Sequence, residues 1–314
     1  IEIETFYDRV LRRPHVTKRH TGRAPLTKRL TSERYILARL MDFHRFAEKE
    51  YGVDSPDWSA LGSDLTGSLV SAHVITPKEY HLALQSLCPR SDAFDREATL
   101  DAFVLLLGYR FGLRASEAIS LARSDWVTTS GACVVVISAR HRSTKSFAGR
   151  RQIPLMGTFS DHEQFIVESW LKHWELFGPK APNAPLFFSE VTPKIPTKVQ
   201  PHRTRIVSTL RAVCSSSDVT LHHARHSFAN LLALRLIFPE LLDTYPAFAF
   251  GELWDAQQTS LQLLKHDKPT RRAAWALAAT LGHAHPQTTF HHYTHLLHDW
   301  ANVHCQKANP RAFE

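Results

Sequence analysis

Residues 221–229 of this 314-residue chain read LHHARHSFA, and an apolar pattern continues from them to about residue 236. The spacing of the apolar residues predicts a helix over 222–236. His222 and Arg225 are three positions apart, so both side chains lie on one face of that helix. Such a pair is also typical of an ordinary solvated helix surface. Its meaning therefore depends on the other motifs of the chain.

Two other segments also carry candidate functional residues, and each has an ordinary alternative explanation. In residues 112–121, GLRASEAISL, Arg114 follows a Gly-Leu bend just before a short predicted helix, and Glu117 lies three positions later. Residues 281–295, LGHAHPQTTFHHYTH, contain five histidines and Tyr293. Each segment alone has an ordinary explanation, because Arg114 can pair with Glu117 at the surface and a tyrosine can fill a core.

The remaining sequence predicts a mainly α-helical protein with one small antiparallel β-sheet. Residues 133–138 are apolar and β-branched, and together with RRQIPL at 150–155 they predict two or three short antiparallel strands. Thr76 as a cap and Pro77 at the first helical position predict a helix start, and Gly112 predicts the end of a buried helix. Further helical patterns occur at 31–52, 160–177, 202–215, 252–265, 270–282 and 286–300.

Composition and charge indicate a polyanion as partner. The chain has a formal net charge of +8 and a pI near 9.4, and it has no apolar run approaching the roughly 18 residues of a membrane span. Its four cysteines are far apart and form no CxxC pair, which favours a reduced, cytoplasmic protein over a zinc ribbon or a disulfide scaffold. The first residue is Ile1, which we expect of a fragment or a processed chain.

The N-terminal segment is strongly basic. Between Arg9 and Arg29 there are eight Lys or Arg residues and no acidic residue. This composition predicts either an extended arm that lies along a phosphate backbone or a solvated tail. In the first case, the candidate DNA contacts are Arg12, Arg13, Lys18 and Arg19.

Four motifs occur in a fixed order along the chain: GLRASE at 112–117, STKSFAGRRQIPL at 143–155, HHARHSFA at 222–229 and LGHAHPQTTFHHYTH at 281–295. This series resembles the catalytic domain of the tyrosine site-specific recombinases, the phage integrase family, over about residues 75–300. The resemblance implies a mainly helical catalytic domain with a small antiparallel sheet, which breaks and rejoins duplex DNA without a metal or another cofactor. It also implies a bacterial or phage setting, in the cytoplasm, with the DNA of a mobile genetic element as substrate.

The resemblance implies that Tyr293 is the nucleophile. Its hydroxyl attacks the scissile phosphate, the 5′-hydroxyl leaves, and the covalent 3′-phosphotyrosyl link retains the bond energy for rejoining. Negative charge builds on the non-bridging phosphate oxygens during attack, and guanidinium groups match that geometry and stay charged. Arg114 and Arg225 correspond to the two arginines of the family, each expected to contribute on the order of 10²–10³ in rate.

Four further residues correspond to assisting groups of the family. A tyrosine hydroxyl has a pKa of about 10 and needs a proton acceptor, for which His222 is placed. His283 corresponds to the residue that hydrogen-bonds the phosphate, and Lys145 to the hairpin lysine that protonates the leaving 5′-oxygen. Glu117 corresponds to a recurring carboxylate, which we expect to orient Arg114 or His222.

Histidine is a common metal ligand, so the histidines of residues 281–295 also raise the alternative of a metal site. His291 and His295 are four positions apart on a predicted helix, which is a chelating spacing. However, no nearby carboxylate or cysteine completes a ligand set, and the chain contains no HExxH or DxD motif. We therefore expect no metal and no cofactor.

One departure from the family pattern is the interval between two motifs. Arg225 and His283 are 58 positions apart, which is much further than in the family and indicates an insertion at about 236–270. The insertion is either a tolerated elaboration or a contact with another protomer or partner. Its aromatic residues look exposed and slightly favour a contact, namely Phe248, Phe250 and Trp254.

We expect two parts in the chain. Residues 1–72 form a basic arm with a helical DNA-binding segment, shorter than the core-binding domain of the family, and residues 73–314 form the catalytic domain. By the resemblance, four copies act together on synapsed duplex DNA, and the segment after Tyr293 packs onto a neighbouring copy. The apolar face of that segment consists of Leu296, Leu297, Trp300 and Val303.

Two alternative functions stay open at this point. A type IB topoisomerase uses the same arginine, lysine, histidine and tyrosine chemistry to relax DNA, but the HHARHSFA segment and the spacing from His283 to Tyr293 favour a recombinase. The second alternative is a non-catalytic DNA-binding accessory protein of the same fold. The intact motif residues argue against it.

Overall fold

A computed structural model describes the chain at residues 3–12, 16–18, 28–30, 33–54, 56, 73–91, 93–129, 132–138, 149–181, 183–266, 270–294 and 296–308. The chain divides into two compact units, Ile1–Val70 and Ser71–Glu314. Each unit is described by itself below. None of the described helices is both long enough and apolar enough to span a membrane.

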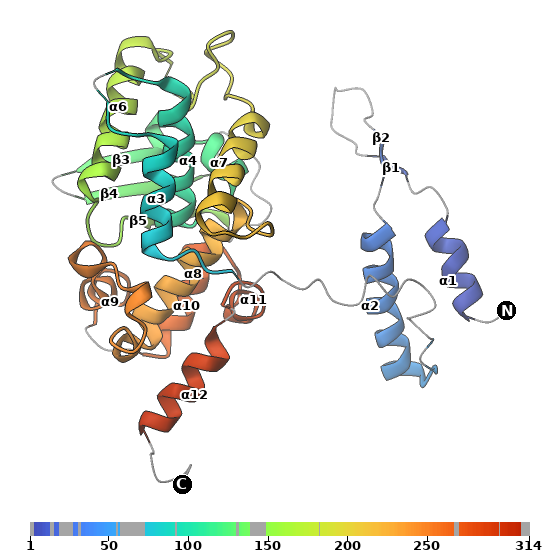
Figure 1. Cartoon of the computed structure of the whole chain (residues 1–314). Helices are drawn as coiled ribbons and strands as arrows, with labels where there is room; N and C mark the ends of the chain where they lie inside the picture. Colours follow the sequence, from blue (N-terminus) through green and yellow to red (C-terminus); the bar gives the residue numbers. More distant parts are fainter. Residues whose placement is uncertain are drawn as a thin grey trace. The chain divides into compact units, whose positions relative to one another are not determined.

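The described residues of the first unit form two helices and a short antiparallel hairpin (Figure 1). The elements are α1 (Ile3–Arg12), β1 (Val16–Lys18), β2 (Lys28–Leu30) and α2 (Glu33–Tyr51). The prediction of a helix at α2 is confirmed. The expectation of an extended arm from Arg9 onward is wrong for Arg9–Arg12, because these residues belong to α1.

A buried polar contact joins α1 to α2. Tyr7 is 2% exposed and donates a hydrogen bond to His44 Nδ1 at 2.8 Å, while His44 Nε2 donates to the Asp54 carbonyl at 2.9 Å. Since the carbonyl can only accept, the neutral His44 ring carries its proton on Nε2. A helix as short as α1 is marginal by itself, so this contact with α2 explains why it forms.

The second unit is mainly helical, and its described strands form one three-stranded antiparallel sheet (Figure 1), which confirms the predicted fold class. Its elements are α3 (Pro77–Leu87), α4 (Arg96–Phe111), α5 (Ala115–Ile119), η2 (Arg123–Asp125), β3 (Trp126–Thr129), β4 (Ala132–Ile137), β5 (Arg151–Pro154), α6 (Asp161–Phe177), α7 (Val199–Val213), α8 (His222–Ile237), η4 (Pro239–Leu241), η5 (Pro246–Phe248), η6 (Gly251–Trp254), α9 (Ala256–Leu264), α10 (Arg272–Leu281), α11 (Pro286–His292) and α12 (Leu297–Ala308).

Helix α4 lies at the centre of the core. All its residues from Thr99 to Phe111 are buried, and the helix contacts α3, α6, α7 and α8. A sequence that is apolar all round is typical of a helix buried on every side. Helix α4 ends at Gly112, where φ is 63° and where an added Cβ would lie 2.4 Å from the Phe228 ring of α8. Glycine is therefore required here, and the close approach brings the start of α5 beside α8.

The sheet has the order β3-β4-β5, with β4 in the middle. In the register of β4 with β5, Val135 pairs with Ile153 and Ile137 pairs with Arg151. Side chains alternate along a strand, so the buried Val135, Ile137 and Ile153 face the core and Arg151 lies on the same face. The strand pattern thus places an arginine on the buried side of β5, which packs against α10.

The predicted insertion after α8 packs into the core. Phe250 and Trp254 are 6% and 1% exposed, and Phe248 is partly buried, so the expectation of exposed aromatic residues is wrong. The reason is that buried arginines of α4 and α8 stack on these rings. The guanidinium carbon of Arg110 lies 4.8 Å from the Phe250 ring centre, and that of Arg235 lies 4.6 Å from the Trp254 ring centre.

Helix α12 packs apolar residues against its own chain. Trp300 is 1% exposed, and its ring centre lies 6.5 Å from those of Phe238 and Phe248. His304 pairs with Glu240 at 2.5 Å. At Trp300, the face that we expected to contact a neighbouring copy is therefore covered within the chain. The other members of that face are Leu296 and Val303, which are partly buried against the core, and Leu297, whose side chain lies outside the described residues.

Candidate active site

Arg225 is a buried residue that connects the sequence motifs. Its side chain is 0% exposed and donates to the Gly112 carbonyl at 2.5 Å and to the Leu281 carbonyl at 2.6 Å. Its Nη2 also lies 3.2 Å from Nε2 of His283. Gly112 ends α4 and Leu281 ends α10. One guanidinium group therefore joins α8 to the loops that carry Arg114 and His283.

The charge of Arg225 persists despite its burial. Burial and the nearby charge of Arg114 lower the pKa of Arg225 from 12.5 to about 10, so the guanidinium stays protonated at neutral pH. Nε of Arg225 is buried and donates to no atom of the described chain. A buried donor without an acceptor is costly, and an anionic oxygen bound at this site would remove that cost.

Glu117 holds two arginines at the site. It accepts hydrogen bonds from the backbone N–H of Arg114 at 2.9 Å and from Nη1 of Arg114 at 2.8 Å. Arg151 donates to the same carboxylate from Nη2 at 2.9 Å and from Nη1 at 3.3 Å. The side chain of Arg114 is 38% exposed. It can therefore reach a ligand while Glu117 holds one of its nitrogens. This geometry supports the expectation that Glu117 orients Arg114.

The protonation state of Glu117 follows from its neighbours. Burial raises the pKa of this carboxyl, but the hydrogen bonds and charge of Arg151, with the backbone hydrogen bond from Arg114, lower it from 4.5 to about 2 overall. Nη1 of Arg225 lies 3.8 Å from the carboxylate and adds to this effect. Glu117 is thus a permanent anion at neutral pH. It acts as a counter-ion for the arginines and not as a proton donor.

Arg151 is a residue of this site that the sequence interpretation did not single out. It is 9% exposed and donates from Nε to the Thr280 carbonyl at 2.9 Å. Gly282 follows α10 with a φ of 74°, and a Cβ there would lie 2.9 Å from Nη1 of Arg151. The glycine before His283 therefore leaves room for Arg151. The sequence signal was present, because strand alternation puts Arg151 on the same face as the apolar Ile153.

Tyr293 lies among these motifs and is 8% exposed. The guanidinium carbon of Arg225 lies 5.1 Å from its ring centre. The ring centre of His283 is 4.8 Å away and that of His222 is 5.6 Å away. The ring of His226, which sequence reasoning did not select, stacks on the tyrosine at 4.7 Å. The structure thus brings Tyr293 together with three of its predicted partners.

The helix predicted over 286–300 is interrupted at Tyr293. Helix α11 ends at His292, and α12 begins at Leu297. Asn230 of α8 donates from Nδ2 to the Tyr293 carbonyl at 2.7 Å. In a continuous helix this carbonyl would accept a hydrogen bond from a backbone N–H of the next turn. Here it accepts from a side chain of another helix instead. The prediction of one helix is wrong here, and the tyrosine follows directly on the end of α11.

The ring of His283 is held in one tautomer. Arg225 can only donate, so Nε2 of His283 is the acceptor and Nδ1 carries the proton. Nδ1 donates to Oγ1 of the buried Thr289 at 2.8 Å. In this tautomer Nε2 carries no proton, so it cannot donate a hydrogen bond to a phosphate while it accepts from Arg225.

His222 begins α8 and has an exposed side chain, but its ring also lies edge-on to those of His226 and Tyr293, with 4.7 and 5.6 Å between the ring centres. Desolvation of the ring and the charges of Arg225 and Arg114 lower its pKa from 6.5 to about 4. The imidazole is therefore neutral at pH 7. A neutral ring with an available lone pair is the form that a proton acceptor requires.

Five predicted residues lie outside the described part of the chain, either wholly or with their side chains. Lys145, expected to protonate the leaving oxygen, lies outside the described residues, as do Arg13 and Arg19. Arg12 is the last residue of α1 and Lys18 the last of β1, but their side chains are outside the described part. The roles of these five residues stay predictions.

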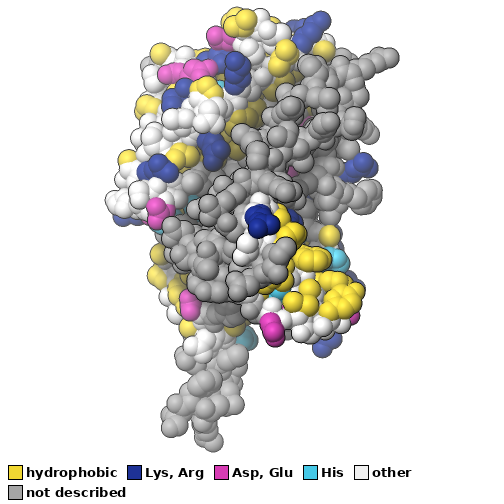
Figure 2. All heavy atoms as spheres, turned by 90° about the vertical axis from the view of Figure 1, so that its right-hand side faces the viewer, with side chains coloured by type: hydrophobic (Ala, Val, Ile, Leu, Met, Phe, Trp, Pro, Cys, Tyr) yellow, Lys and Arg dark blue, Asp and Glu magenta, His cyan; other side chains and the backbone are white. Residues whose placement is uncertain are grey.

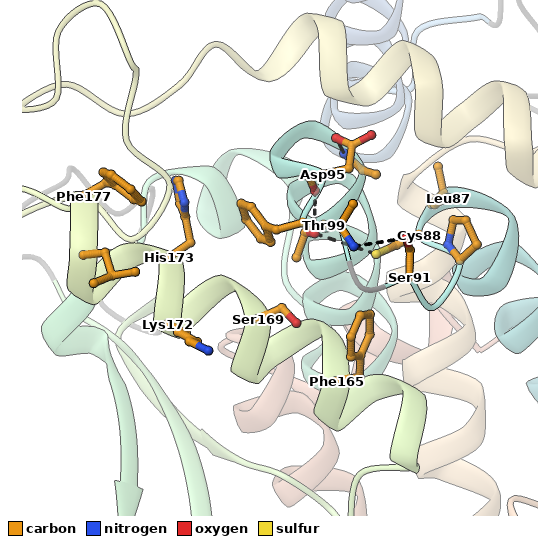
Figure 3. Close-up of a pocket in the computed structure, with 15 residues that line it drawn as sticks. Leu87, Cys88, Ser91, Asp95, Thr99, Phe165, Ser169, Lys172, His173 and Phe177 are labelled. Atoms are coloured by element: carbon orange, nitrogen blue, oxygen red, sulfur yellow. Dashed lines mark hydrogen bonds between the residues drawn. The ribbon is translucent and has the colours of Figure 1, made fainter.

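The residues around Tyr293 are separate from a large apolar cavity of the same unit. That cavity has a volume of about 590 Å³ and lies between α3, the start of α4, and α6. In Figure 3, His173 and Phe177 of α6 lie on one side of it, and Leu87 of α3 and the following Cys88 lie on the other. None of the candidate catalytic residues that the structure describes lines it. On the molecular face drawn in Figure 2, described Lys and Arg side chains are spread out and interspersed with acidic ones.

Comparison with known proteins identifies the class. Residues 73–236 match the sequence profile described as the phage integrase family. No curated protein matches the sequence. The XerH site-specific recombinase, solved in a post-cleavage complex with its palindromic difH substrate, is similar over 90% of this chain and 67% of its own, with 16% identity and a TM-score of 0.53. The Tn1549 transposon integrase in complex with transposon right end DNA is similar over 88% and 78% of the two chains, with 18% identity and a TM-score of 0.48.

This family match, with the fold, defines a tyrosine recombinase, an enzyme that breaks and rejoins DNA. The chain belongs to the phage integrase family. It spans about two thirds of the length of XerH. The family match ends at residue 236, before the insertion, whereas His283 and Tyr293 follow the insertion. The contacts of Arg225 show where this later segment rejoins the matched part.

Proposed function

We propose that this chain recombines DNA at specific sites, with Tyr293 as the nucleophile and duplex DNA as the substrate. One observation carries the proposal. Segments before and after the insertion meet at Arg225, whose guanidinium carbon lies 5.1 Å from the Tyr293 ring and whose Nη2 lies 3.2 Å from His283. Membership of the phage integrase family and the solved complex of XerH with difH support DNA as the substrate.

In the proposed reaction, the hydroxyl of Tyr293 gives its proton to neutral His222 and attacks the scissile phosphorus. The new bond is a 3′-phosphotyrosyl ester, and the bond from phosphorus to the 5′-oxygen breaks. Arg225 from inside and the more exposed Arg114 from outside bind the non-bridging oxygens, where negative charge builds. Lys145 gives a proton to the leaving 5′-oxygen. Attack by a 5′-hydroxyl reverses the steps and rejoins the strand.

The larger assembly is part of the same proposal. Four copies hold two DNA duplexes during strand exchange, and residues 1–72 grip the DNA through Arg12, Arg13, Lys18 and Arg19 while residues 73–314 carry out the chemistry. Analytical ultracentrifugation of the protein with its cleaved DNA tests the tetramer. The free thiols of Cys88, Cys133 and Cys214 fit a reducing compartment such as the cytoplasm of a bacterium.

A library of nicked duplexes of randomised sequence tests the reaction and selects its target site in one experiment. A nick next to the scissile phosphate lets the short 5′-hydroxyl fragment diffuse away, so the covalent adduct accumulates. We expect DNA that stays attached to the protein after boiling in detergent, and sequencing it yields the target site. Absence of any adduct from DNA that the protein binds tightly contradicts the proposal.

Two tyrosine variants show whether the adduct forms at the proposed residue. Tyr293→Phe removes only the hydroxyl, and we expect complete loss of the adduct with DNA binding retained. Tyr51→Phe is the matched control, because Tyr51 ends α2 and is 75% exposed. An adduct that persists in Tyr293→Phe assigns the nucleophile to another residue.

A further inference from the structure

A second cluster of reactive side chains lies where α3 and α7 pack together. His73 precedes α3, Glu79 is in its first turn, and Cys214 is the C-cap of α7. The three donor atoms, one nitrogen, one oxygen and one sulfur, lie within 4.8 Å of one another. Nε2 of His73 is 4.0 Å from Oε1 of Glu79. These residues take no part in the DNA chemistry proposed above.

Two features of the cluster indicate that it binds something. Nε2 of His73 is buried and has no hydrogen-bond partner in the described chain, which is costly for a polar nitrogen. Glu79 is fixed independently, because its Oε2 accepts from the backbone N–H of Thr76 at 2.7 Å and from Oγ1 of Thr76 at 2.8 Å. The capping box of α3 thus holds the carboxylate in place and leaves Oε1 as the oxygen nearest to His73.

We propose that His73, Glu79 and Cys214 bind a zinc ion, with a water molecule in the fourth position. Thiolate, imidazole and carboxylate are the three protein donors that zinc prefers. With bonds of about 2.0–2.3 Å, the donor atoms of a tetrahedral site are separated by about 3.3–3.8 Å. The observed donor atoms, which lie within 4.8 Å of one another, therefore have to close by at most about 1.0–1.5 Å, which side-chain rotation provides.

Binding of zinc at this site exchanges a proton for the metal. Cysteine binds zinc as its thiolate and not as its thiol. On binding, the S–H bond breaks, the S–Zn bond forms, and the proton passes to solvent. The affinity for zinc therefore rises with pH.

The position of the site suggests what zinc does for the protein. It would fasten the segment just before α3 to both α3 and α7. The His73 ring also lies edge-on to His223, with 6.4 Å between the ring centres, and His223 directly follows His222 of the active site. Zinc that binds only the folded chain would stabilise this packing increasingly as its concentration rises above the dissociation constant, so the melting temperature of the full chain should rise with zinc concentration.

Cobalt(II) titration of the full chain tests the site. Cobalt(II) bound to a thiolate gives a charge-transfer absorption in the near ultraviolet, which ligation by histidines alone does not give. We expect this band at one cobalt per chain, with its loss on addition of zinc. Absence of the band at saturating cobalt overturns the proposal, because Cys214 is then not a ligand.

Matched cysteine variants locate the metal. We expect Cys214→Ser to lower the zinc affinity by more than about 100-fold, since changes outside the ligand shell alone cost up to about 100-fold. Cys88→Ser, a buried thiol at the end of α3, should bind zinc like the unmodified chain. Equal affinity of both variants overturns the proposal.

A measurement on the unmodified protein covers the case in which Cys214→Ser fails to fold. Alkylation followed by peptide mass spectrometry reports on each cysteine separately. We expect zinc to slow the alkylation of Cys214 at least about tenfold and to leave Cys88 and Cys133 unchanged, because a metal-bound thiolate is shielded. Unchanged alkylation of Cys214 in saturating zinc overturns the proposal. Neither this result nor the cobalt result depends on cleavage of DNA.

Discussion

Replacement of Glu117 by glutamine tests the arginine cluster most directly. The carboxyl is 15% exposed, and its pKa falls from 4.5 to about 2 in the folded chain. This fall of the pKa corresponds to about 3–4 kcal/mol of stability, since a tenfold change in a proton-binding constant is worth about 1.4 kcal/mol. Glu117→Gln removes the charge and leaves the buried Arg151 and Arg225 without their counter-ion. We therefore expect the free energy of unfolding to fall by about 3–4 kcal/mol at pH 7.

The sign of the pH dependence makes this prediction specific. A depressed pKa of Glu117 stabilises the folded chain above the unfolded value of about 4.5, and the contribution is lost as pH falls toward 2. The difference between wild type and Glu117→Gln should be constant from pH 7 to about 5.5 and shrink below about 4.5. Urea unfolding at several pH values measures it. Glu168→Gln, at an exposed position of α6, should stay within about 0.5 kcal/mol of wild type. Equal effects of the two variants refute the reasoning.

Three further predictions concern the residues around the tyrosine. Gly282→Ala puts a Cβ 2.9 Å from Arg151 and should lower the free energy of unfolding in urea by about 2–3 kcal/mol. Gly251→Ala is the control, because Gly251 has a φ of 58° but open space around it, and it should cost about 1 kcal/mol. Equal losses in the two variants contradict the clash with Arg151. Because the pKa of His222 is about 4, the single-turnover cleavage rate should not lose its proton acceptor between pH 8 and about 5.5, and a fall centred near pH 6.5 contradicts this assignment. Trp300→Ala should lower the unfolding free energy of the dilute chain by about 3–5 kcal/mol, and no change in urea unfolding means that the ring is not buried in its own chain.

Local geometry explains which parts of the site were predictable. His222 and Arg225 are neighbours on one helix turn, so their common face follows from spacing alone. The same holds for Arg114 and Glu117, whose ion pair at 2.8 Å closes over a single turn. Helix starts such as Thr76 were predictable too, because capping is a local interaction, and the structure shows the full capping box there.

The remaining features depend on contacts between distant segments. Helix α1 was missed because its stability comes from Tyr7 bonding to His44, which is 37 positions away. The insertion looked exposed because nothing in its own sequence shows that Arg110 and Arg235 lie over its aromatic rings. The break at Tyr293 was missed because Asn230, on another helix, takes the carbonyl that would continue the helix. The spacing of apolar residues indicates only the local helical propensity, and tertiary contacts override that propensity at these points.

The insertion bears on how Tyr293 is delivered to the phosphate. The insertion connects α8 to α10, and these two helices pack against each other. The longer interval therefore does not separate Tyr293 from Arg225 of the same chain, whose guanidinium carbon lies 5.1 Å from the tyrosine ring. The insertion instead adds a surface for α12, because its residues Phe238 and Phe248 cover Trp300, seven positions after the tyrosine. A neighbouring copy that binds this face must displace Phe238 and Phe248 from it. Docking within the chain and docking between chains are therefore mutually exclusive at Trp300. In the arrangement described here, the tyrosine faces the arginine of its own chain.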